Sequence, residues 1–309
     1  MLTIWKQTNR LIEIDEFEKG CWINVTDPTP DEVDRLVNEL RIPVDYINDI
    51  LDVDERSRTE GEGRWLMIII RIPVFRTDSN VPYVTVPLGI LISPHHIVTI
   101  CLYENDVIRS ILYPVKTKAI QIENKINFVL EIFHRSASLY LHYLKDINVR
   151  TTQIEKRIER STQNKELQNL MRMEKCLVFF ITSLKSNELL LQKLQRSRFA
   201  SSPDLNEDLL SDVVIEIKQA IEMSQIYSDI QANLMDAFAS IISNNLNDVM
   251  KQLTSITIIL MIPTLIASYF GMNLNNHFED SKYAFFYVVV GSLVLSFLGV
   301  LIFRRRNLF

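Results

Sequence analysis

Residues 283–303 read YAFFYVVVGSLVLSFLGVLIF and contain no charged side chain. At about 1.5 Å per residue this stretch makes a helix of roughly 30 Å, the thickness of the hydrocarbon core of a bilayer. Residues 252–278 are a second uncharged stretch, and its apolar part, Leu253 to Phe270, reaches about 27 Å as a helix. The alternative is a hairpin buried in a soluble core, but such helices rarely lack a polar face over this length. The sequence therefore predicts two transmembrane helices near the C-terminus.

The flanking charges predict the orientation of these helices. Residues 304–306 are three arginines, whereas the link between the two stretches carries Glu279, Asp280 and Lys282. The positive-inside rule places the arginines in the cytoplasm, and two crossings return the chain to the side from which it started. The first residues do not combine a basic segment with an apolar one, so no cleaved signal peptide is expected. We therefore expect a multi-pass protein of the cell membrane with both termini in the cytoplasm.

The composition argues against several classes of protein. The 309 residues carry a formal net charge of −5, unlike the basic surface of a general nucleic-acid-binding protein. The three cysteines do not have the spacing of zinc ligands, and neither GxGxxG nor GxxxxGK[ST] occurs. No arrangement of a nucleophile with its base is apparent in the sequence. We expect a protein that is not an enzyme, has no resident cofactor and binds no nucleic acid.

Residues 1–115 predict a cytoplasmic α/β domain. Runs rich in β-branched and aromatic residues indicate strands at 22–25, 65–75, 83–92 and 97–102. The segment Thr29-Pro30-Asp31-Glu32 has the pattern of a helix start, with Thr29 as N-cap and Glu32 closing a capping box. Strands and helices at this density predict an α+β fold in which helices cover a sheet.

Long helices are predicted from residue 116 onward. Residues 121–200 carry fourteen Lys and Arg against eight Asp and Glu, a net charge of +6. Residues 203–250 carry one Lys against nine Asp and Glu, a net charge of −8. Apolar residues recur at steps of three and four, which is typical of helices. We expect a basic helical hairpin over 116–202 and an acidic stalk helix over 203–251 that continues unbroken into the first apolar stretch.

The acidic stalk has two interpretations. Glu222, Asp229 and Asp236 are seven residues apart, so they share one face of the helix. Their carboxylates can be solvated or paired with the basic hairpin. Alternatively, carboxylates of neighbouring copies can share a divalent cation, which prefers oxygen ligands.

The most specific motif is SYFGMN, which ends the first apolar stretch at residues 268–273. Alone, Gly271 and Asn273 could simply cap a helix. Followed by a short link and a second terminal span, and preceded by an acidic helix, the motif resembles that of the CorA family of magnesium transporters, whose signature is Tyr-Gly-Met-Asn. Asn247–Thr254 and Asp54–Glu60 also resemble stretches of this family. The chain departs from the family at Phe270, which stands directly before Gly271, and in a link without Met-Pro-Glu-Leu.

The resemblance implies a homopentamer in the lipid bilayer. The first transmembrane helix, 252–273, would line a central pore, and the second, 283–303, would form an outer ring. Residues 274–282 would be the outer loop, and residues 304–309 a basic cytoplasmic tail. The long helices would form a funnel between the α/β domain and the membrane.

The resemblance also implies which residues meet the ion. Gly271, Met272 and Asn273 would form a filter whose neutral oxygens hold Mg²⁺ through its water shell. A near-heptad repeat runs along the first apolar stretch, and such a repeat also suits plain helix packing. Together with the family resemblance, this repeat places further residues at the pore. These pore-lining and gate residues are Asn247, Met250, Leu253, Thr257, Met261 and Thr264. Pro263 removes one backbone donor and would kink the helix or free a carbonyl toward the pore.

Regulation is expected in the acidic stalk. Asp212 resembles a family sensor residue by its position, and Asp208 and Glu216 are further candidate ligands for regulatory Mg²⁺. Glu279 and Asp280 would attract cations to the outer mouth. The expected function is passive Mg²⁺ transport driven by the membrane potential and gated by cytoplasmic Mg²⁺. Transport of Co²⁺, Ni²⁺ or Zn²⁺ by the same architecture is the alternative, as is a membrane-anchored scaffold or sensor without transport.

Overall fold

The computed structural model of the chain describes residues 1–8, 10–77, 79–113, 122, 124–160, 164–197, 205–272 and 283–305. The chain divides into two compact units, Met1–Leu234 and Met235–Phe309.

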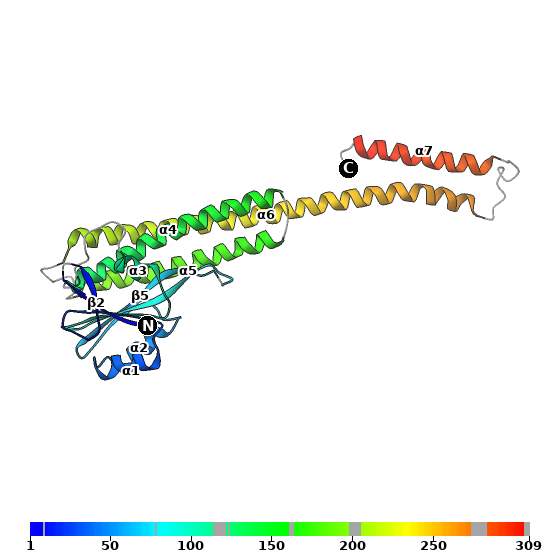
Figure 1. Ribbon diagram of the computed structural model, residues 1–309. Helices are drawn as coiled ribbons and strands as arrows, with labels where there is room; N and C mark the ends of the chain where they lie inside the picture. The colour runs from blue at the N-terminus through cyan, green and yellow to red at the C-terminus, as the bar shows by residue number, and fades with distance from the viewer. Residues whose placement is uncertain are drawn as a thin grey trace. The chain divides into compact units, whose positions relative to one another are not determined.

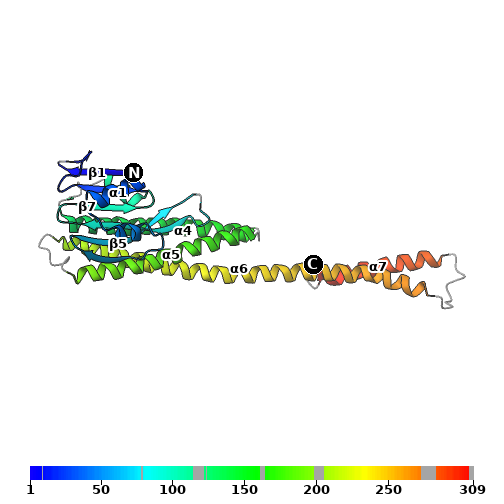
Figure 2. The same cartoon turned by 90° about the horizontal axis from the view of Figure 1, so that it is seen from below.

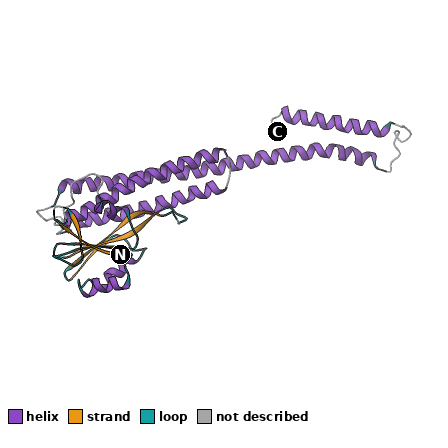
Figure 3. Cartoon of the chain, viewed as in Figure 1, coloured by secondary structure: helices purple, strands orange, loops and turns teal. Residues whose placement is uncertain are grey.

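The first unit contains a seven-stranded mixed sheet (Figures 1 and 3). Its order is β2-β1-β3-β7-β6-β5-β4, and all neighbouring strands are antiparallel except the parallel pair β3 and β7. The strands are β1 (Leu2–Gln7), β2 (Leu11–Ile14), β3 (Trp22–Thr26), β4 (Arg58–Glu62), β5 (Trp65–Phe75), β6 (Tyr83–Ile92) and β7 (Ile97–Cys101). The four predicted strands correspond to β3, β5, β6 and β7, whereas β1, β2 and β4 were not predicted.

Helices cover both faces of this sheet (Figures 1 and 2). On β5, Ile68 and Ile70 are buried in one apolar cluster, and Met67 and Ile69 in another on the opposite face. The first cluster includes residues of α3 (Asp106–Leu112), α4 (Lys125–Arg160) and α5 (Asn164–Gln195). The second includes residues of α1 (Pro30–Asn38) and α2 (Val44–Leu51). A strand buried on both faces reads as a continuous apolar run, and the predicted helix-covered sheet is confirmed.

Helix α1 begins as predicted. Thr29 Oγ1 accepts a hydrogen bond from the backbone N–H of Glu32 at 3.3 Å. The Glu32 carboxylate accepts one in return from the backbone N–H of Thr29 at 2.9 Å, and Pro30 occupies the first turn. The capping box therefore satisfies two donors that a helix start leaves free.

A side chain of α5 anchors the long helices to the sheet. β4 pairs with β5 only as far as Ile69, so the edge of β5 is open at Arg71. Asn187 Nδ2 donates to the Arg71 carbonyl at 2.8 Å, and Asn187 Oδ1 accepts from the Arg71 N–H at 2.9 Å. The amide thus replaces a neighbouring strand, and the backbone N–H and carbonyl of Arg71 keep their hydrogen bonds.

The long helices follow one another as predicted, with two helices before one that continues into the first apolar stretch. Helices α4 and α5 pack against each other, and α6 (Glu207–Phe270) contributes Val213 and Ile217 to the same apolar cluster as α4. The 64-residue helix α6 runs without a break from the acidic segment into the first apolar stretch and passes through Pro263. Its first part lies in the first unit and its last part in the second.

The second unit consists of the end of α6 and helix α7 (Ala284–Arg305). Both helices are long and apolar enough to span a membrane. Small residues lie where they meet: Ser255 and Ser292 are buried, and a Cβ added at Gly299 would lie 3.5 Å from the Ile262 side chain. Small residues allow close approach of transmembrane helices. The predicted outer loop, 274–282, lies outside the described residues.

Candidate functional site

The predicted pore residues share one side of α6. Met250, Leu253 and Met261 are 52%, 57% and 62% exposed in the single chain. Asn247, Thr257 and Thr264 are exposed as well. The side that meets α7 carries Ser255, which is 4% exposed, and lies roughly 150° away around the axis at 3.6 residues per turn. In the single chain α7 therefore leaves the predicted pore face uncovered.

Threonines give this face a particular chemistry. The hydroxyl of Thr257 donates to the Leu253 carbonyl at 2.8 Å, and that of Thr264 donates to the Leu260 carbonyl at 3.2 Å. Since each hydroxyl hydrogen is used within the helix, the oxygen lone pairs remain as acceptors. The face therefore combines apolar methionines with neutral acceptors, and it carries no charge between Lys251 and Met272.

Pro263 does not free a carbonyl toward the pore. A proline at this position cannot donate to the carbonyl of Ile259, four residues earlier. The hydroxyl of Ser296 on α7 instead donates to this carbonyl at 3.5 Å. The freed carbonyl thus faces the partner helix, and the expectation that it faces the pore is wrong. Sequence alone did not identify Ser296, because nothing local pairs the two positions.

Part of the predicted filter lies in the described residues. The backbone N–H of Gly271 donates to the Ala267 carbonyl at 2.9 Å, and Met272 is 49% exposed. Among the glycines that the structure describes, positive φ occurs at Gly20 and Gly63, so Gly271 is not in the left-handed conformation of a typical cap. Asn273, Glu279 and Asp280 lie outside the described residues.

The candidate regulatory residues differ in their surroundings. Asp208 and Asp212 are exposed. Glu216 is half-buried, and its carboxylate lies 3.2 Å from His134 Nε2 and accepts a hydrogen bond from Ser138 Oγ at 2.8 Å. Burial raises the pKa of Glu216, but the hydrogen bonds from His134 and Ser138 outweigh it and hold the pKa below its ordinary value. The hydrogen bond to Glu216 raises the pKa of His134 against the opposing effect of burial.

The single chain does not assemble a metal site from its described residues, where no three His, Cys, Asp or Glu side chains group suitably. Within that part of the chain, the stalk carboxylates make one ion pair with the basic hairpin, between Glu216 and His134. Pairing with the basic hairpin therefore describes Glu216, whereas Asp208, Asp212, Glu222, Asp229 and Asp236 are exposed in the single chain.

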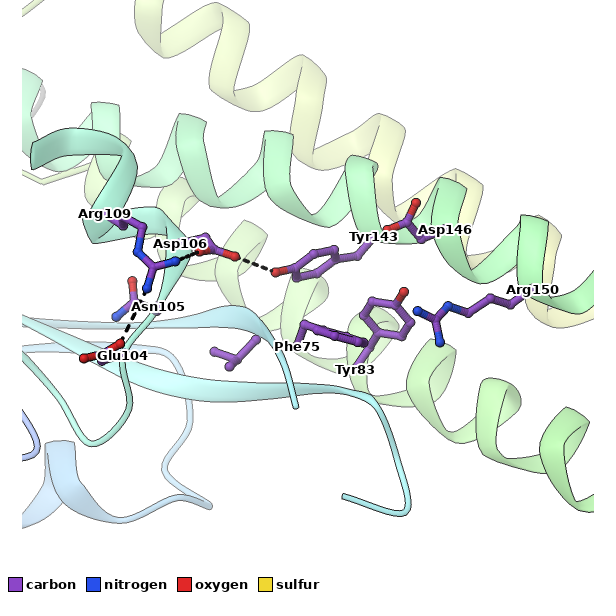
Figure 4. A pocket seen from close by; sticks show the side chains of 10 residues that line it. Phe75, Tyr83, Glu104, Asn105, Asp106, Arg109, Tyr143, Asp146 and Arg150 are labelled. Carbon is purple, nitrogen blue, oxygen red and sulfur yellow. Dashed lines mark hydrogen bonds and ion pairs between the residues drawn. The ribbon is translucent and has the colours of Figure 1, made fainter. Parts of the chain in front are cut away.

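A cavity of about 500 Å³ in the first unit was not indicated by any motif (Figure 4). At one end Arg109 pairs with Asp106 at 3.2 Å, and the Tyr143 hydroxyl donates to the same carboxylate at 3.0 Å. At the other end the guanidinium of Arg150 lies over the ring of Tyr83, 5.4 Å from its centroid. Since protein groups already contact both arginines, the cavity does not by itself indicate a ligand.

Comparison with known proteins agrees with this architecture. A family model described as CorA-like Mg²⁺ transporter protein matches residues 17–306. The cobalt/magnesium transport protein CorA of Methanocaldococcus jannaschii is 27% identical over 293 residues, which are 93% of this chain and 90% of that protein. The magnesium transport protein CorA of Helicobacter pylori is 23% identical over 303 residues, which are 96% of this chain and 92% of that protein.

Solved structures show the same fold. The complete structure of the CorA magnesium transporter from Methanocaldococcus jannaschii matches with a TM-score of 0.78 and 23% identity, over 99% of this chain and 98% of that one. The full-length CmaX protein matches with a TM-score of 0.68 and 13% identity, over 98% and 96% of the two chains. Since the family model covers nearly the whole chain, the protein belongs to the CorA-like family of Mg²⁺ transporters.

Proposed function

We propose that the protein is a passive, potential-driven Mg²⁺ channel of the cell membrane, assembled as a homopentamer with α6 lining the pore. The observation that carries this proposal is the face of α6 that α7 leaves uncovered. That face holds acceptor oxygens at Thr257 and Thr264 beside the apolar side chains of Leu253 and Met261. Around a five-fold axis it would enclose a water-filled path. Both termini would lie in the cytoplasm.

The acceptor chemistry suits a hydrated ion. Mg²⁺ gives up its water reluctantly, and its bound waters donate hydrogen bonds. Rings of threonine oxygens, followed by the carbonyl of Gly271 and the amide of Asn273, would accept these bonds without removing the water shell. Neutral acceptors also release the ion, as conduction requires. Met272 completes this filter segment, and Glu279 and Asp280 would concentrate cations at its outer mouth.

Apolar residues at the inner end of the same face supply the gate. Met250 and Leu253 are exposed and lie one turn apart. Rings of such side chains would expel water from a narrow pore and block a hydrated ion until the ring widens. Asn247 would meet the ion on the cytoplasmic side of this gate, and Met261 would line the path beyond it.

The driving force is the membrane potential. Neither apolar stretch carries a charged side chain that could relay protons. Two positive charges crossing the membrane gain about 4.6 kcal/mol per 100 mV. This is enough to draw Mg²⁺ inward without a second substrate.

Cytoplasmic Mg²⁺ would regulate the channel through the acidic stalk. Asp208 and Asp212 are exposed and so are accessible to an ion shared with a neighbouring copy. Glu216 is already bound by His134 and Ser138, which makes it the weakest of the three candidates. A bridging ion would hold neighbouring stalks together and favour the closed state.

Co²⁺ is a second candidate cargo, because the curated relative from Methanocaldococcus jannaschii is named a cobalt/magnesium transport protein. Co²⁺ and Mg²⁺ both accept six oxygen ligands, and a filter that contacts only the water shell distinguishes them weakly. We expect Co²⁺ to compete with Mg²⁺ for uptake. Competition of Ni²⁺ and Zn²⁺ with Mg²⁺ for uptake tests the same weak discrimination between hydrated cations.

The deciding experiment measures Mg²⁺ uptake into proteoliposomes under a valinomycin-imposed, inside-negative potential. Mg²⁺ uptake by the wild type should increase with the imposed potential. The Asn273→Ala protein should lose its selectivity for Mg²⁺ over other cations. Asn233→Ala, which changes an exposed amide of α6 in the first unit, is the control and should leave uptake unchanged. Equal selectivity of the wild type and Asn273→Ala would remove the filter assignment. Absence of any wild-type flux would favour the scaffold or sensor.

A further inference from the structure

A second cavity of the first unit, of about 530 Å³, lies between the sheet and α3, and no motif indicated it. Thr3 and Trp5 of β1 and Asn24 of β3 line it from the sheet, and Leu112 of α3 lines it from the helix layer. Thr3 is paired with Asn24, and Trp5 is paired with Glu13 of β2. Paired residues share one face of a sheet, so all four side chains lie on the face that α3 covers. The cavity has the size of a small-molecule site.

Buried hydrogen bonds fix the orientation of the Asn24 amide. The indole N–H of Trp22 donates to Thr99 Oγ1 at 2.9 Å, and the Thr99 hydroxyl donates to Asn24 Oδ1 at 2.9 Å. Since the amide oxygen faces Thr99, the NH₂ group faces away from Thr99. Asn24 is 7% exposed, and among the described residues no atom accepts a hydrogen bond from Nδ2. Because a buried donor without an acceptor destabilises the folded protein, Nδ2 favours an acceptor in the cavity that Asn24 lines.

The wall of the cavity is apolar. The indole N–H of Trp5 donates to Thr3 Oγ1 at 3.0 Å, so Trp5 offers its ring to the cavity. Ile108 and Leu112 of α3 add aliphatic side chains. An indole ring packs against apolar groups and attracts cations over its face. The wall therefore suits a ligand with an apolar body, whereas water would satisfy only the amide of Asn24.

Unpaired carboxylates also line the cavity. Glu13 and Asp27 are exposed, and in the described part of the chain neither side chain forms an ion pair or a hydrogen bond. The cations that line the cavity, Arg109 and the N-terminal ammonium of Met1, each have a carboxylate partner. The lining therefore has an excess of negative charge, which attracts a cation and repels an anion.

We infer that this cavity binds a small organic cation that carries an ammonium group, an apolar body and a hydrogen-bond acceptor. The acceptor meets Nδ2 of Asn24, and the body packs on the ring of Trp5. The ammonium lies near Glu13 and Asp27. Because β1 lies between β2 and β3, Glu13 and Asn24 are roughly 10 Å apart across the sheet, a distance that a substituted aromatic amine spans. A metal ion, in contrast, would meet a donor at Asn24 where it needs an acceptor.

Isothermal titration calorimetry of the full-length protein in detergent tests this inference with three probes. Tyramine carries the ammonium, an aromatic ring and a hydroxyl group that can accept a hydrogen bond. Phenethylamine lacks the hydroxyl group, and 4-hydroxyphenylacetate carries a carboxylate in place of the ammonium. Tyramine should bind, and phenethylamine should bind about two- to tenfold more weakly because it loses one hydrogen bond. We expect no binding of 4-hydroxyphenylacetate.

Variants locate the binding in this cavity. Glu13→Gln/Asp27→Asn should weaken tyramine binding about two- to tenfold, because two exposed ion pairs are lost. Asp45→Asn, which changes an exposed carboxylate of α2 on the opposite face of the sheet, is the matched control and should have no effect. In Asn24→Ala, tyramine and phenethylamine should bind equally. Thermal unfolding checks that this buried variant folds, and the probe comparison in the wild type tests the role of Asn24 if it does not.

Four results would overturn the inference. The first is the absence of tyramine binding, which would mean that water alone fills the cavity. The second and third are equal affinities of the wild type for tyramine and phenethylamine, or for tyramine and 4-hydroxyphenylacetate. The fourth is an equal loss in Asp45→Asn and Glu13→Gln/Asp27→Asn, which would indicate a general attraction of amines to acidic surfaces. None of these measurements involves Mg²⁺ flux, so their outcome is independent of the proposed channel.

Discussion

At the residue scale, Gly89 shows how a missing side chain positions a helix. A Cβ placed on Gly89 of β6 would overlap the side chain of Ile50 in α2. Gly89 has an ordinary backbone conformation, so close packing rather than a positive φ accounts for the glycine. Ile50 is buried in the cluster that α1 and α2 form against the sheet. The absence of a side chain therefore lets α2 approach the strand directly.

Gly89→Ala should destabilise the first unit. The added methyl group must displace Ile50 from a packed cluster, and overpacking of this kind costs about 1–3 kcal/mol. Gly61→Ala on the exposed edge strand β4 is the matched control, because a Cβ there would lie 4.0 Å from the side chain of Leu66 on β5. Thermal unfolding of the full-length protein in detergent measures both. A Gly89→Ala protein as stable as the control would show that α2 can shift at little cost.

At the element scale, two side-chain contacts join helices that are distant in sequence. His134 of α4 lies 3.2 Å from Glu216 of α6. Ser296 of α7 donates to the Ile259 carbonyl of α6, which Pro263 leaves without its helical donor. The first contact depends on charge, whereas the second depends on a missing backbone hydrogen. The two contacts therefore respond to different changes.

The contact between His134 and Glu216 should make stability depend on pH. The raised pKa of His134 gives a stabilisation that is complete below the unfolded value of about 6.5 and is lost as pH rises through the folded pKa. The lowered pKa of Glu216 gives a second stabilisation, which is present above about pH 4.5 and is lost as the pH falls through the pKa of the folded state. His134→Gln should therefore destabilise the protein most between about pH 4.5 and 6.5, and least at pH 9.

Unfolding by denaturant across this pH range measures the effect. His142→Gln is the control, since His142 is 65% exposed and lies 3.8 Å from Asp146 on the same helix. An effect of His134→Gln that is the same at pH 6 and pH 9 would mean that packing rather than charge joins the two helices.

Ser296→Ala should weaken the contact between α6 and α7. Hydrogen bonds between transmembrane helices contribute about 0.6 kcal/mol on average, up to about 1.7. Ser292→Ala is the control, because the Ser292 hydroxyl donates within α7 to Val289. Pro263→Ala restores a backbone donor for Ile259 and should reduce the cost of Ser296→Ala. Unfolding in mixed detergent micelles completes this double-mutant cycle, and an unchanged cost in the Pro263→Ala background would contradict the account.

At the scale of the whole molecule, charge is divided between distinct parts of the chain. The basic hairpin and the acidic stalk carry opposite net charges, while the apolar stretches carry none. In the single chain, Asp208 and Asp212 remain exposed and so are available to a partner outside it. This distribution suits an assembly in which neighbouring stalks meet through cations.

The proposed regulation predicts that Asp212→Ala weakens the inhibition of flux by Mg²⁺ on the cytoplasmic side, because the proposed bridging ion would lose a ligand. Flux from proteoliposomes preloaded with graded Mg²⁺ concentrations measures the inhibition constant. Asp34→Ala, which changes an exposed carboxylate of α1, should leave that constant unchanged. Identical inhibition curves for the wild type and Asp212→Ala would remove Asp212 from the regulatory site.

The sequence alone determined the elements whose signals are local. The apolar runs of β5 and β6, the capping box at Thr29 and the two uncharged helices are each encoded within a few turns or strand residues. The short strands β1, β2 and β4 were missed because their stability comes from pairing with partners rather than from their own pattern. Only the tertiary structure showed that Gly89 receives Ile50, that Glu216 is held by His134, and that Ser296 compensates for Pro263. Each of these contacts joins residues far apart in the chain, and no periodicity, cap or propensity encodes such a pair.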